Sequence, residues 1–319
     1  MSMQRKPEWL RVKMPTGPEF EATNERLRRH GLNTVCSSAR CPNMAECWGR
    51  GTATFLILGD TCTRHCRFCS VATGNPKGQL DETEPGRVAA AVRELGLGYV
   101  VLTSVDRDDL PDFGAEAFAR TVRAVKGECL MTNDECRVEW AAQPGIDKGT
   151  AQDAARQSTI PRVEVLTPDF GGKEELIGQL VAAGPDVFGH NIETVERLSP
   201  NVRDRRATYR RSLAVLATVK RLNPAMKTKS SILVGIGETV PELEQAMRDL
   251  RGAGCDIVTI GQYLQPAANC IPVERYVTPD EFAALEASAR ALGFAQAFAG
   301  PLVRSSYHAA EVFAPVAGS

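Results

Sequence analysis

The feature that most constrains this chain is a C-x3-C-x2-C run formed by Cys62, Cys66 and Cys69, directly after the apolar stretch Thr54–Leu58. Thiolates this close converge on one metal centre, and three ligands leave a four-coordinate site open. A [4Fe–4S] cluster held in this way has one iron without a protein ligand, which is free to bind another molecule. A structural zinc site would want a fourth Cys or His. His65 is adjacent to Cys66 and poorly placed to complete that tetrahedron, so we favour iron and sulfur over zinc.

A second trio, Cys36, Cys41 and Cys47, has the spacing C-x4-C-x5-C and again supplies three ligands. A lone cysteine is usually a small inert apolar residue, but six in two tight sets are not. The alternative is one four-cysteine zinc site built across both trios with two cysteines idle. We prefer two separate clusters, because that arrangement leaves no ligand unused.

The residues around these cysteines resemble known family motifs. The run Cys62–Cys69 is similar to the radical S-adenosylmethionine signature, including the aromatic Phe68 before its third cysteine. The two trios together, followed by Arg304–Ala309 (RSSYHA), resemble the lipoyl synthase family. The blocks Thr103–Leu110, Val163–Phe170 and Gly261–Pro266 are also similar to that family. The resemblance runs from about Pro7 to about Ala310, except for an atypical insertion at about 127–159.

Composition excludes several classes of protein. The chain has 319 residues, 43% of them apolar, and a formal net charge of −1, so neither bulk nucleic-acid attraction nor membrane attraction is expected. It has no run of 18 apolar residues and no apolar signal region at its N-terminus. Ten cysteines without a signal peptide indicate metal or redox chemistry in a reducing compartment. We therefore expect a cytoplasmic protein.

Strands and helices alternate from about residue 52 onward. The expected strands are Thr54–Leu58, Tyr99–Thr103, Arg162–Leu166, Asp186–His190, Lys229–Val234 and Asp256–Ile260. The expected helices are Glu21–Arg29, one through Val88 and Val92, one that begins near Thr208, Glu242–Leu250 and Pro279–Leu292. This order predicts an α/β fold with a parallel sheet, either an open doubly wound sheet or a barrel.

The family resemblance implies a radical S-adenosylmethionine partial (β/α)6 barrel with its active site at the C-terminal strand ends. The N-terminal extension (1–50) and the C-terminal segment (301–319) would close over an auxiliary cluster, and the barrel would span 51–300. The insertion contains Cys129 and Cys136, and two ligands without a nearby His are too few for a closed zinc site. We expect it to be a surface insertion without chemistry.

Polar residues that follow the strands are candidate cofactor contacts. Asn191 and Glu193 can hydrogen-bond ribose hydroxyls, Gly235 can present a main-chain amide, and Thr103 and Phe68 lie beside the same strand ends. For Gly235 the alternative is a tight turn, and for Glu193 a helix N-terminal carboxylate. The charged run Asp106–Asp109 holds either cofactor or substrate, or is a solvated loop.

The resemblance also assigns roles. Cys62, Cys66 and Cys69 would hold the [4Fe–4S] cluster that binds and cleaves S-adenosylmethionine. Cys36, Cys41 and Cys47 would hold a second [4Fe–4S] cluster, with Ser306 as its fourth ligand and Ser305 as the alternative. His308 is interpreted as structural. The expected reaction inserts two sulfur atoms, taken from the second cluster, at carbons 6 and 8 of an octanoyl group amide-linked to a carrier lysine.

The implied partners are octanoylated lipoyl carrier domains, namely 2-oxoacid dehydrogenase E2 subunits and the glycine cleavage H protein. A reductant such as ferredoxin or flavodoxin and an iron–sulfur carrier for cluster repair are also implied. An arginine cluster at Arg203, Arg205, Arg206, Arg210 and Arg211 is either a docking surface for an acidic carrier or a solvated helix start. The alternatives to this function are a biotin synthase-like enzyme and a non-catalytic iron–sulfur or zinc scaffold.

Overall fold

The computed structural model describes residues 5–11, 18–35, 41, 43–49, 52–127 and 160–306. Cys36, the residues Tyr307 and His308 of the C-terminal motif, and nearly all of the insertion with Cys129 and Cys136 lie outside the described residues. The predictions made for them are therefore not addressed by the structure. Both serines of the motif, Ser305 and Ser306, are described.

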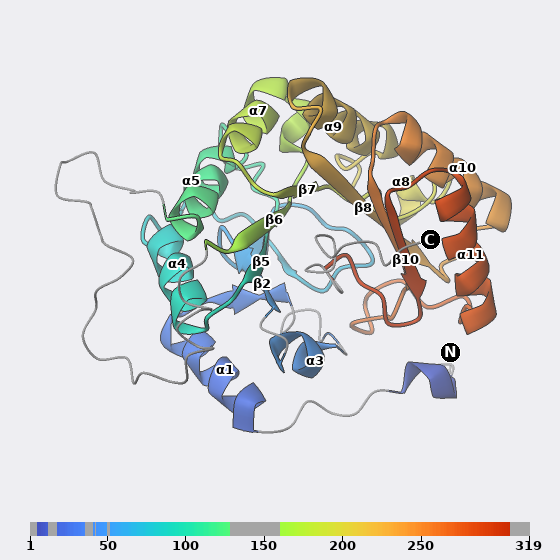
Figure 1. Ribbon diagram of the computed structural model, residues 1–319, viewed down its shortest axis with the longest axis horizontal. Helices are drawn as coiled ribbons and strands as arrows, with labels where there is room; N and C mark the ends of the chain where they lie inside the picture. The colour runs from blue at the N-terminus through green and yellow to red at the C-terminus, as the bar shows by residue number, and fades with distance from the viewer. Residues whose placement is uncertain are drawn as a thin grey trace.

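A twisted sheet of mainly parallel strands forms the centre of the molecule (Figure 1). Its strands in spatial order are β1 (Asn33–Thr34), β2 (Thr52–Ile57), β5 (Tyr99–Ser104), β6 (Arg162–Leu166), β7 (Val187–Gly189), β8 (Lys227–Val234), β9 (Ile257–Gln262) and β10 (Gln296–Gly300). Only β1 runs antiparallel to its neighbour. All six predicted strands are confirmed, whereas β1 and β10 were not predicted. A separate small pair, β3 (Thr61–Cys62) and β4 (Ala72–Thr73), lies in the loop after β2.

Helices cover the outer face of this curved sheet (Figure 1). They are α4 (Glu84–Glu94), α5 (Ala115–Val125), α7 (Glu174–Ala182), α9 (Tyr209–Leu222), α10 (Val240–Gly252) and α11 (Pro279–Ala291). Shorter helical segments are η1 (Glu8–Leu10), α3 (Met44–Gly49), η2 (Phe170–Gly172) and α8 (Ser199–Val202). A further helix, α1 (Pro18–Arg29), precedes the first strand in the chain. The five helices predicted from the sequence are all present. Among the described helices, none is both long and apolar enough to cross a membrane.

The sequence explains where the helices begin. Thr208 caps α9 by accepting a hydrogen bond from the Arg211 N–H, at the position predicted for the start of that helix. Thr278 and Glu281 form a capping box at α11, followed by Pro279 in the first turn. Because a proline ring and a missing N–H are tolerated only in that first turn, these residues set the helix start.

The two faces of the sheet bury different residues. Val100 and Leu102 of β5 point to the helices and join the main apolar core, whereas Tyr99 and Val101 point to the inner face. On the inner face Lys229 donates to both oxygens of Glu164, at 2.9 and 3.0 Å, and the Tyr99 hydroxyl donates to the same carboxylate at 2.8 Å. This buried, paired cluster fills the inside of the sheet near the N-terminal strand ends.

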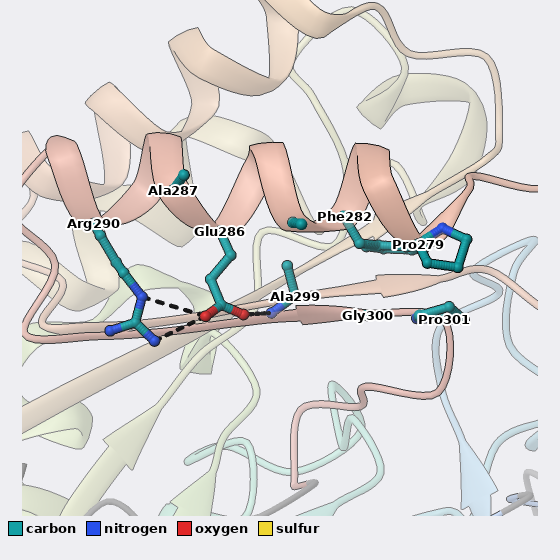
Figure 2. Close-up of a pocket in the computed structure, with 9 residues that line it drawn as sticks. Pro279, Phe282, Glu286, Ala287, Arg290, Ala299, Gly300 and Pro301 are labelled. Carbon is teal, nitrogen blue, oxygen red and sulfur yellow. Dashed lines mark hydrogen bonds and ion pairs between the residues drawn. The ribbon is translucent and has the colours of Figure 1, made fainter. Parts of the chain in front are cut away.

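The edge strand β10 is protected by α11. Glu286 accepts the Ala299 N–H at 3.1 Å and also pairs with Arg290 at 2.8 Å, as Figure 2 shows. An open cavity of about 410 Å³ lies beside this pair, lined mainly by Phe282 and small residues. Satisfying an edge N–H with a side chain blocks pairing with another strand. We interpret this region as edge protection, remote in sequence from every predicted site residue except the C-terminal motif.

Candidate active site

The chain leaves β2 through a turn fixed by two charged side chains. Leu58 and Gly59 have φ values of 66° and 95°, in the left-handed region. The carboxylate of Glu84 accepts the Leu58 N–H at 2.7 Å, and Arg107 donates to the Leu58 carbonyl at 3.0 Å. The turn directs the following cysteine loop across the C-terminal ends of the strands.

Each cysteine of this loop accepts a main-chain N–H at its sulfur. The donors are Arg64 to Cys62 at 3.4 Å, Asp204 to Cys66 at 3.3 Å and Val71 to Cys69 at 3.5 Å. Hydrogen bonds of this kind are among the levers that tune thiolate-bound iron–sulfur clusters. The donor set of three sulfurs therefore fits an iron–sulfur cluster.

Burial raises the pKa of all three thiols, that of Cys62 to about 11 and that of Cys66 to about 12. Asp106 raises the pKa of Cys62 further. Without a metal these groups are protonated thiols, and metal binding releases their protons. In the described part of the chain, no three His, Cys, Asp or Glu side chains stand close enough together to hold a single metal ion as they are placed.

The charged run after β5 turns inward and binds the cysteine loop. Asp108 accepts from the Thr63 hydroxyl at 2.7 Å, and Asp106 Oδ2 lies 3.8 Å from Cys62 Sγ. Arg107 and Asp109 pair with each other at 2.8 Å, and Arg107 is only 1% exposed. The run is therefore not a solvated loop. Its contacts position the loop that carries the cysteines, and the expected contact with cofactor or substrate stays a prediction.

Two of the predicted cofactor contacts lie together after β7. Asn191 donates to the Glu193 carboxylate at 3.0 Å. Glu193 adopts a φ of 65° and pairs with Ile232 through a single bridge, which brings it to the end of β8. Burial raises the pKa of its carboxyl group, and nearby Arg203 lowers it. Thr103 is also buried, and its hydroxyl donates to the Leu166 carbonyl at 2.8 Å.

The turn after β8 differs in one respect from the expectation. Gly235 has a φ of 91°, and a Cβ there would meet Gln262 Nε2 at 2.2 Å and the Arg275 carbonyl at 2.4 Å. Glycine is thus required by both conformation and space. Its N–H donates to Glu238 at 2.7 Å, so this amide is not the free donor that the sequence suggested. Gly235 could therefore help to bind a cofactor through the shape of the turn, and not through its N–H group.

The loops after β8 and β9 close against the cysteine loop. Phe68 packs in one cluster with Ile236, Tyr263 and Ile271. The Ile271 N–H donates to the Arg67 carbonyl at 2.9 Å. The cysteine loop is therefore held on its second side by main-chain pairing.

Two cysteines of the second trio, Cys41 and Cys47, lie on a segment bonded to the chain just beyond β10. Cys41 precedes α3 and Cys47 lies on it, and both are partly buried. The Asn43 side chain donates to the Leu302 carbonyl at 2.6 Å. Burial raises the pKa of Cys41, while the nearby Arg304 lowers it. The segment that carries Cys41 is thus bonded to the residues that immediately precede Ser305 and Ser306.

Four arginines of the proposed docking cluster are engaged within the molecule, and three of them, Arg206, Arg210 and Arg211, lie within ion-pair distance of a carboxylate. The partners are Ser212 Oγ for Arg203, Asp204 for Arg206, Glu196 for Arg210 and the Arg206 carbonyl for Arg211. Of these five arginines, Arg205 is the exposed one for which the described residues supply no ion-pair partner. Docking of an acidic carrier stays a prediction, with a solvated helix start as its alternative.

Sequence reasoning did not single out Arg64, Asn43 or Asp169, which the structure places at the site. Arg203 was named only for docking. It is 8% exposed, influences the pKa of Cys66 and of Glu193, and its Nε has no hydrogen-bond partner among the described residues. A buried arginine behind a strand end has no local sequence pattern that would reveal it.

Comparison with known proteins assigns the class. The chain matches the model of the radical SAM superfamily over residues 56–250. A solved maturase of the [FeFe]-hydrogenase has a TM-score of 0.56 at 15% identity, covering 77% of this chain and 50% of that chain. Methylornithine synthase has a TM-score of 0.50 at 13% identity, covering 86% and 73%. These likenesses concern the fold alone. Fold and superfamily match together define a radical S-adenosylmethionine enzyme, which works with iron–sulfur chemistry.

The family follows from closer relatives. Residues 1–41 match the N-terminal domain of lipoyl synthase of the radical SAM family. Lipoyl synthase of Halorhodospira halophila is 52% identical over 309 residues, covering 97% of this chain and 84% of the relative. That of Pyrobaculum calidifontis is 50% identical over 309 residues, covering 96% of each. The chain belongs to the lipoyl synthase family, and it is a radical S-adenosylmethionine sulfurtransferase.

Proposed function

We propose that the enzyme inserts two sulfur atoms, at carbons 6 and 8, into an octanoyl group amide-linked to a lysine of a carrier protein. One observation carries this proposal. The Cys62–Cys69 loop follows β2, and the Cys41–Cys47 segment is bonded to Leu302, just beyond β10. Because β2 and β10 belong to the same parallel set, both groups of thiols are at the C-terminal ends of the strands.

We assign Cys62, Cys66 and Cys69 to a [4Fe–4S] cluster that also binds S-adenosylmethionine. Together these groups supply the one-electron, hydrogen-abstracting chemistry that no side chain provides. The protein holds the thiols, donates N–H groups to their sulfurs and packs Phe68 against the loops after β8 and β9. Asn191 and Glu193 would bind the ribose of the cofactor, and Thr103 and Gly235 would line its site.

We assign Cys36, Cys41, Cys47 and Ser306 to a second [4Fe–4S] cluster, the sulfur source, with Ser305 as the alternative oxygen ligand. Oxygen is a harder ligand than thiolate and a weaker partner for cluster iron. In this assignment the serine oxygen would be the ligand most easily displaced from the cluster. The chain would then divide into an N-terminal extension (1–50), a barrel (51–300) and a C-terminal segment (301–319).

The proposed substrates are octanoylated carrier domains of 2-oxoacid dehydrogenase E2 subunits and of the glycine cleavage H protein. A ferredoxin or flavodoxin would supply electrons, and an iron–sulfur carrier would rebuild the second cluster. The ten cysteines of the chain suit a reducing setting, and we place the enzyme in the cytoplasm.

The test is anaerobic incubation of reconstituted enzyme with an octanoyl-lysine peptide, S-adenosylmethionine and a reductant, followed by mass spectrometry. We expect the product peptide to carry two added sulfur atoms. Before the reaction, the reconstituted enzyme should contain about eight iron atoms per chain, four for each cluster. Iron-loaded enzyme that cleaves S-adenosylmethionine but leaves the peptide unchanged would point to a biotin synthase-like substrate. One zinc and no sulfide would indicate a scaffold.

A further inference from the structure

The cysteine loop has a buried arginine at its centre. Arg64 lies between Cys62 and Cys66 in sequence and is only 4% exposed. Arginine is rarely buried unless its guanidinium is paired, because removing the charge from water is costly. Its position inside the loop, pointing away from solvent, therefore calls for a physical reason.

Carboxylates from two strand ends meet this guanidinium. Arg64 forms a two-pronged pair with Asp169, after β6, in which both bonds are 2.8 Å. It forms a second pair with Asp108, after β5, from Nε at 3.0 Å and from Nη2 at 2.8 Å. Asp106 lies 3.2 Å from Nη1. All three nitrogens of the planar fork are used, and a lysine ammonium cannot reproduce this geometry.

The two residues beside Arg64 are fixed in the same way. The Thr63 N–H donates to the Asp106 carbonyl at 3.0 Å, and Arg206 donates to the Thr63 carbonyl at 2.7 Å. The His65 N–H donates to Asp204 at 2.9 Å. Every residue between the first two cysteines is thus anchored to groups that follow other strands. The path of this loop is set by the protein itself.

We infer that Arg64 is a positioning residue, which holds the cysteine loop in its ligating shape before the cluster is assembled. The inference rests on the proposed assignment of Cys62, Cys66 and Cys69 as ligands. Because the fork reaches both β5 and β6 ends, it fixes the loop against two independent elements. It also pairs Asp106, whose carboxylate would otherwise stand unpaired 3.8 Å from the Cys62 sulfur.

A matched control lies on the inner face of the sheet. Lys229 is buried as deeply as Arg64 and donates to both oxygens of Glu164, at 2.9 and 3.0 Å. The two residues lie within β8 and β6, toward the N-terminal ends of the strands. Glu164→Gln therefore breaks a comparable buried ion pair away from the cysteine loop.

The experiment compares Arg64→Lys, Asp169→Asn, Glu164→Gln and Cys62→Ala, each as the full chain reconstituted anaerobically with iron and sulfide. Two quantities are measured: iron per chain, and amide hydrogen exchange of residues 61–70 in the cluster-free chain. For Arg64→Lys we expect iron to fall from about eight to about four. Exchange in 61–70 should rise about tenfold, while the distant strands keep their protection. Asp169→Asn should change both quantities in the same direction.

Glu164→Gln should keep about eight iron atoms and normal exchange in 61–70, even if its melting temperature falls. Normal iron and exchange in both Arg64→Lys and Asp169→Asn would overturn the inference. So would a uniform loss of protection across the sheet, which indicates a general structural role. If Arg64→Lys does not fold, Asp169→Asn decides by the same criteria. Full iron in Cys62→Ala would instead overturn the ligand assignment, so the two failures are distinguishable.

Discussion

The side-chain amide of Asn43 donates a hydrogen bond of 2.6 Å to the main-chain carbonyl of Leu302, across 259 residues of sequence. Asn43 is 4% exposed, so this bond is shielded from water. It joins the segment of Cys41 and Cys47 to the segment that ends in Ser305 and Ser306. A cluster with ligands from both segments needs this junction to be fixed, because neither segment alone supplies four ligands.

We expect Asn43→Ala to weaken the second cluster selectively. The lost bond leaves a buried carbonyl without a partner, at a cost of about 1–3 kcal/mol. Iron should fall from about eight toward about four per chain, while release of 5′-deoxyadenosine continues. Iron analysis and chromatography of the nucleoside product measure these effects. Asn223→Ala, which removes a local cap on the Ala225 N–H, is the control and should keep all its iron.

Replacement of any cysteine of the first trio should abolish cleavage of S-adenosylmethionine. Cys62→Ala, Cys66→Ala and Cys69→Ala each remove one of three ligands from the cluster that delivers the electron. The measurement is the rate of 5′-deoxyadenosine formation under reducing conditions. Cys255→Ala is a suitable control, since that thiol is fully buried and donates to the Ile257 carbonyl. A normal rate in any of the three ligand variants would refute the assignment.

The second trio should behave differently. Cys36→Ala, Cys41→Ala and Cys47→Ala should retain cleavage of S-adenosylmethionine and lose sulfur insertion, because only the sulfur source is affected. Ser306→Ala should follow the same pattern, whereas Ser305→Ala should not. Mass spectrometry of an octanoyl-lysine peptide distinguishes the outcomes. Full insertion by Ser306→Ala together with its loss in Ser305→Ala would transfer the ligand role to Ser305.

The free energy of unfolding should depend on pH in part through the protonation of His190. Burial, and to a smaller extent Arg203, lowers the pKa of this imidazole from 6.5 to about 4. Between these values the unfolded chain binds a proton that the folded chain does not, so the free energy of unfolding falls as the pH decreases. The full effect is about 3 kcal/mol. Urea unfolding at pH 7 and pH 5 should show a smaller decrease for His190→Gln than for the wild type.

The strands were predictable where their composition is distinctive. β5 and β6 are runs of β-branched and aliphatic residues with turn signals on both sides. β10 has the sequence Gln-Ala-Phe-Ala-Gly, without a β-branched residue, and was missed. Its conformation comes from the five-residue register with β9 and from the Glu286 contact to Ala299. Tertiary pairing overrides weak local propensity in such an edge strand.

The site was predictable to the extent that its chemistry is local in sequence. The spacing of Cys62, Cys66 and Cys69 predicts a cluster-binding loop from only eight consecutive residues. Arg64 and Asp169 are 105 residues apart, and their pairing depends on the strand order, which spacing does not encode. The prediction of a free amide at Gly235 was wrong for a different reason. The carboxylate of Glu238 folds back over the turn and takes the amide that we had interpreted as free.

The last prediction concerns Gly261, the residue of β9 against which the C-terminal segment packs. A Cβ there would meet the Val303 carbonyl oxygen at 2.1 Å and its carbon at 3.0 Å. Because both obstacles are main-chain atoms, Gly261→Ala must displace the segment that leads to Ser306. We expect loss of about four iron atoms per chain and of sulfur insertion, with 5′-deoxyadenosine still formed.

Gly252→Ala, at the end of α10 with no atom within 4 Å of its added Cβ, is the control. It should keep both clusters and gain about 0.5–1 kcal/mol of stability, because alanine loses less backbone entropy in a helix. Undiminished iron in Gly261→Ala would show that the segment does not have to pack against β9 to hold the cluster.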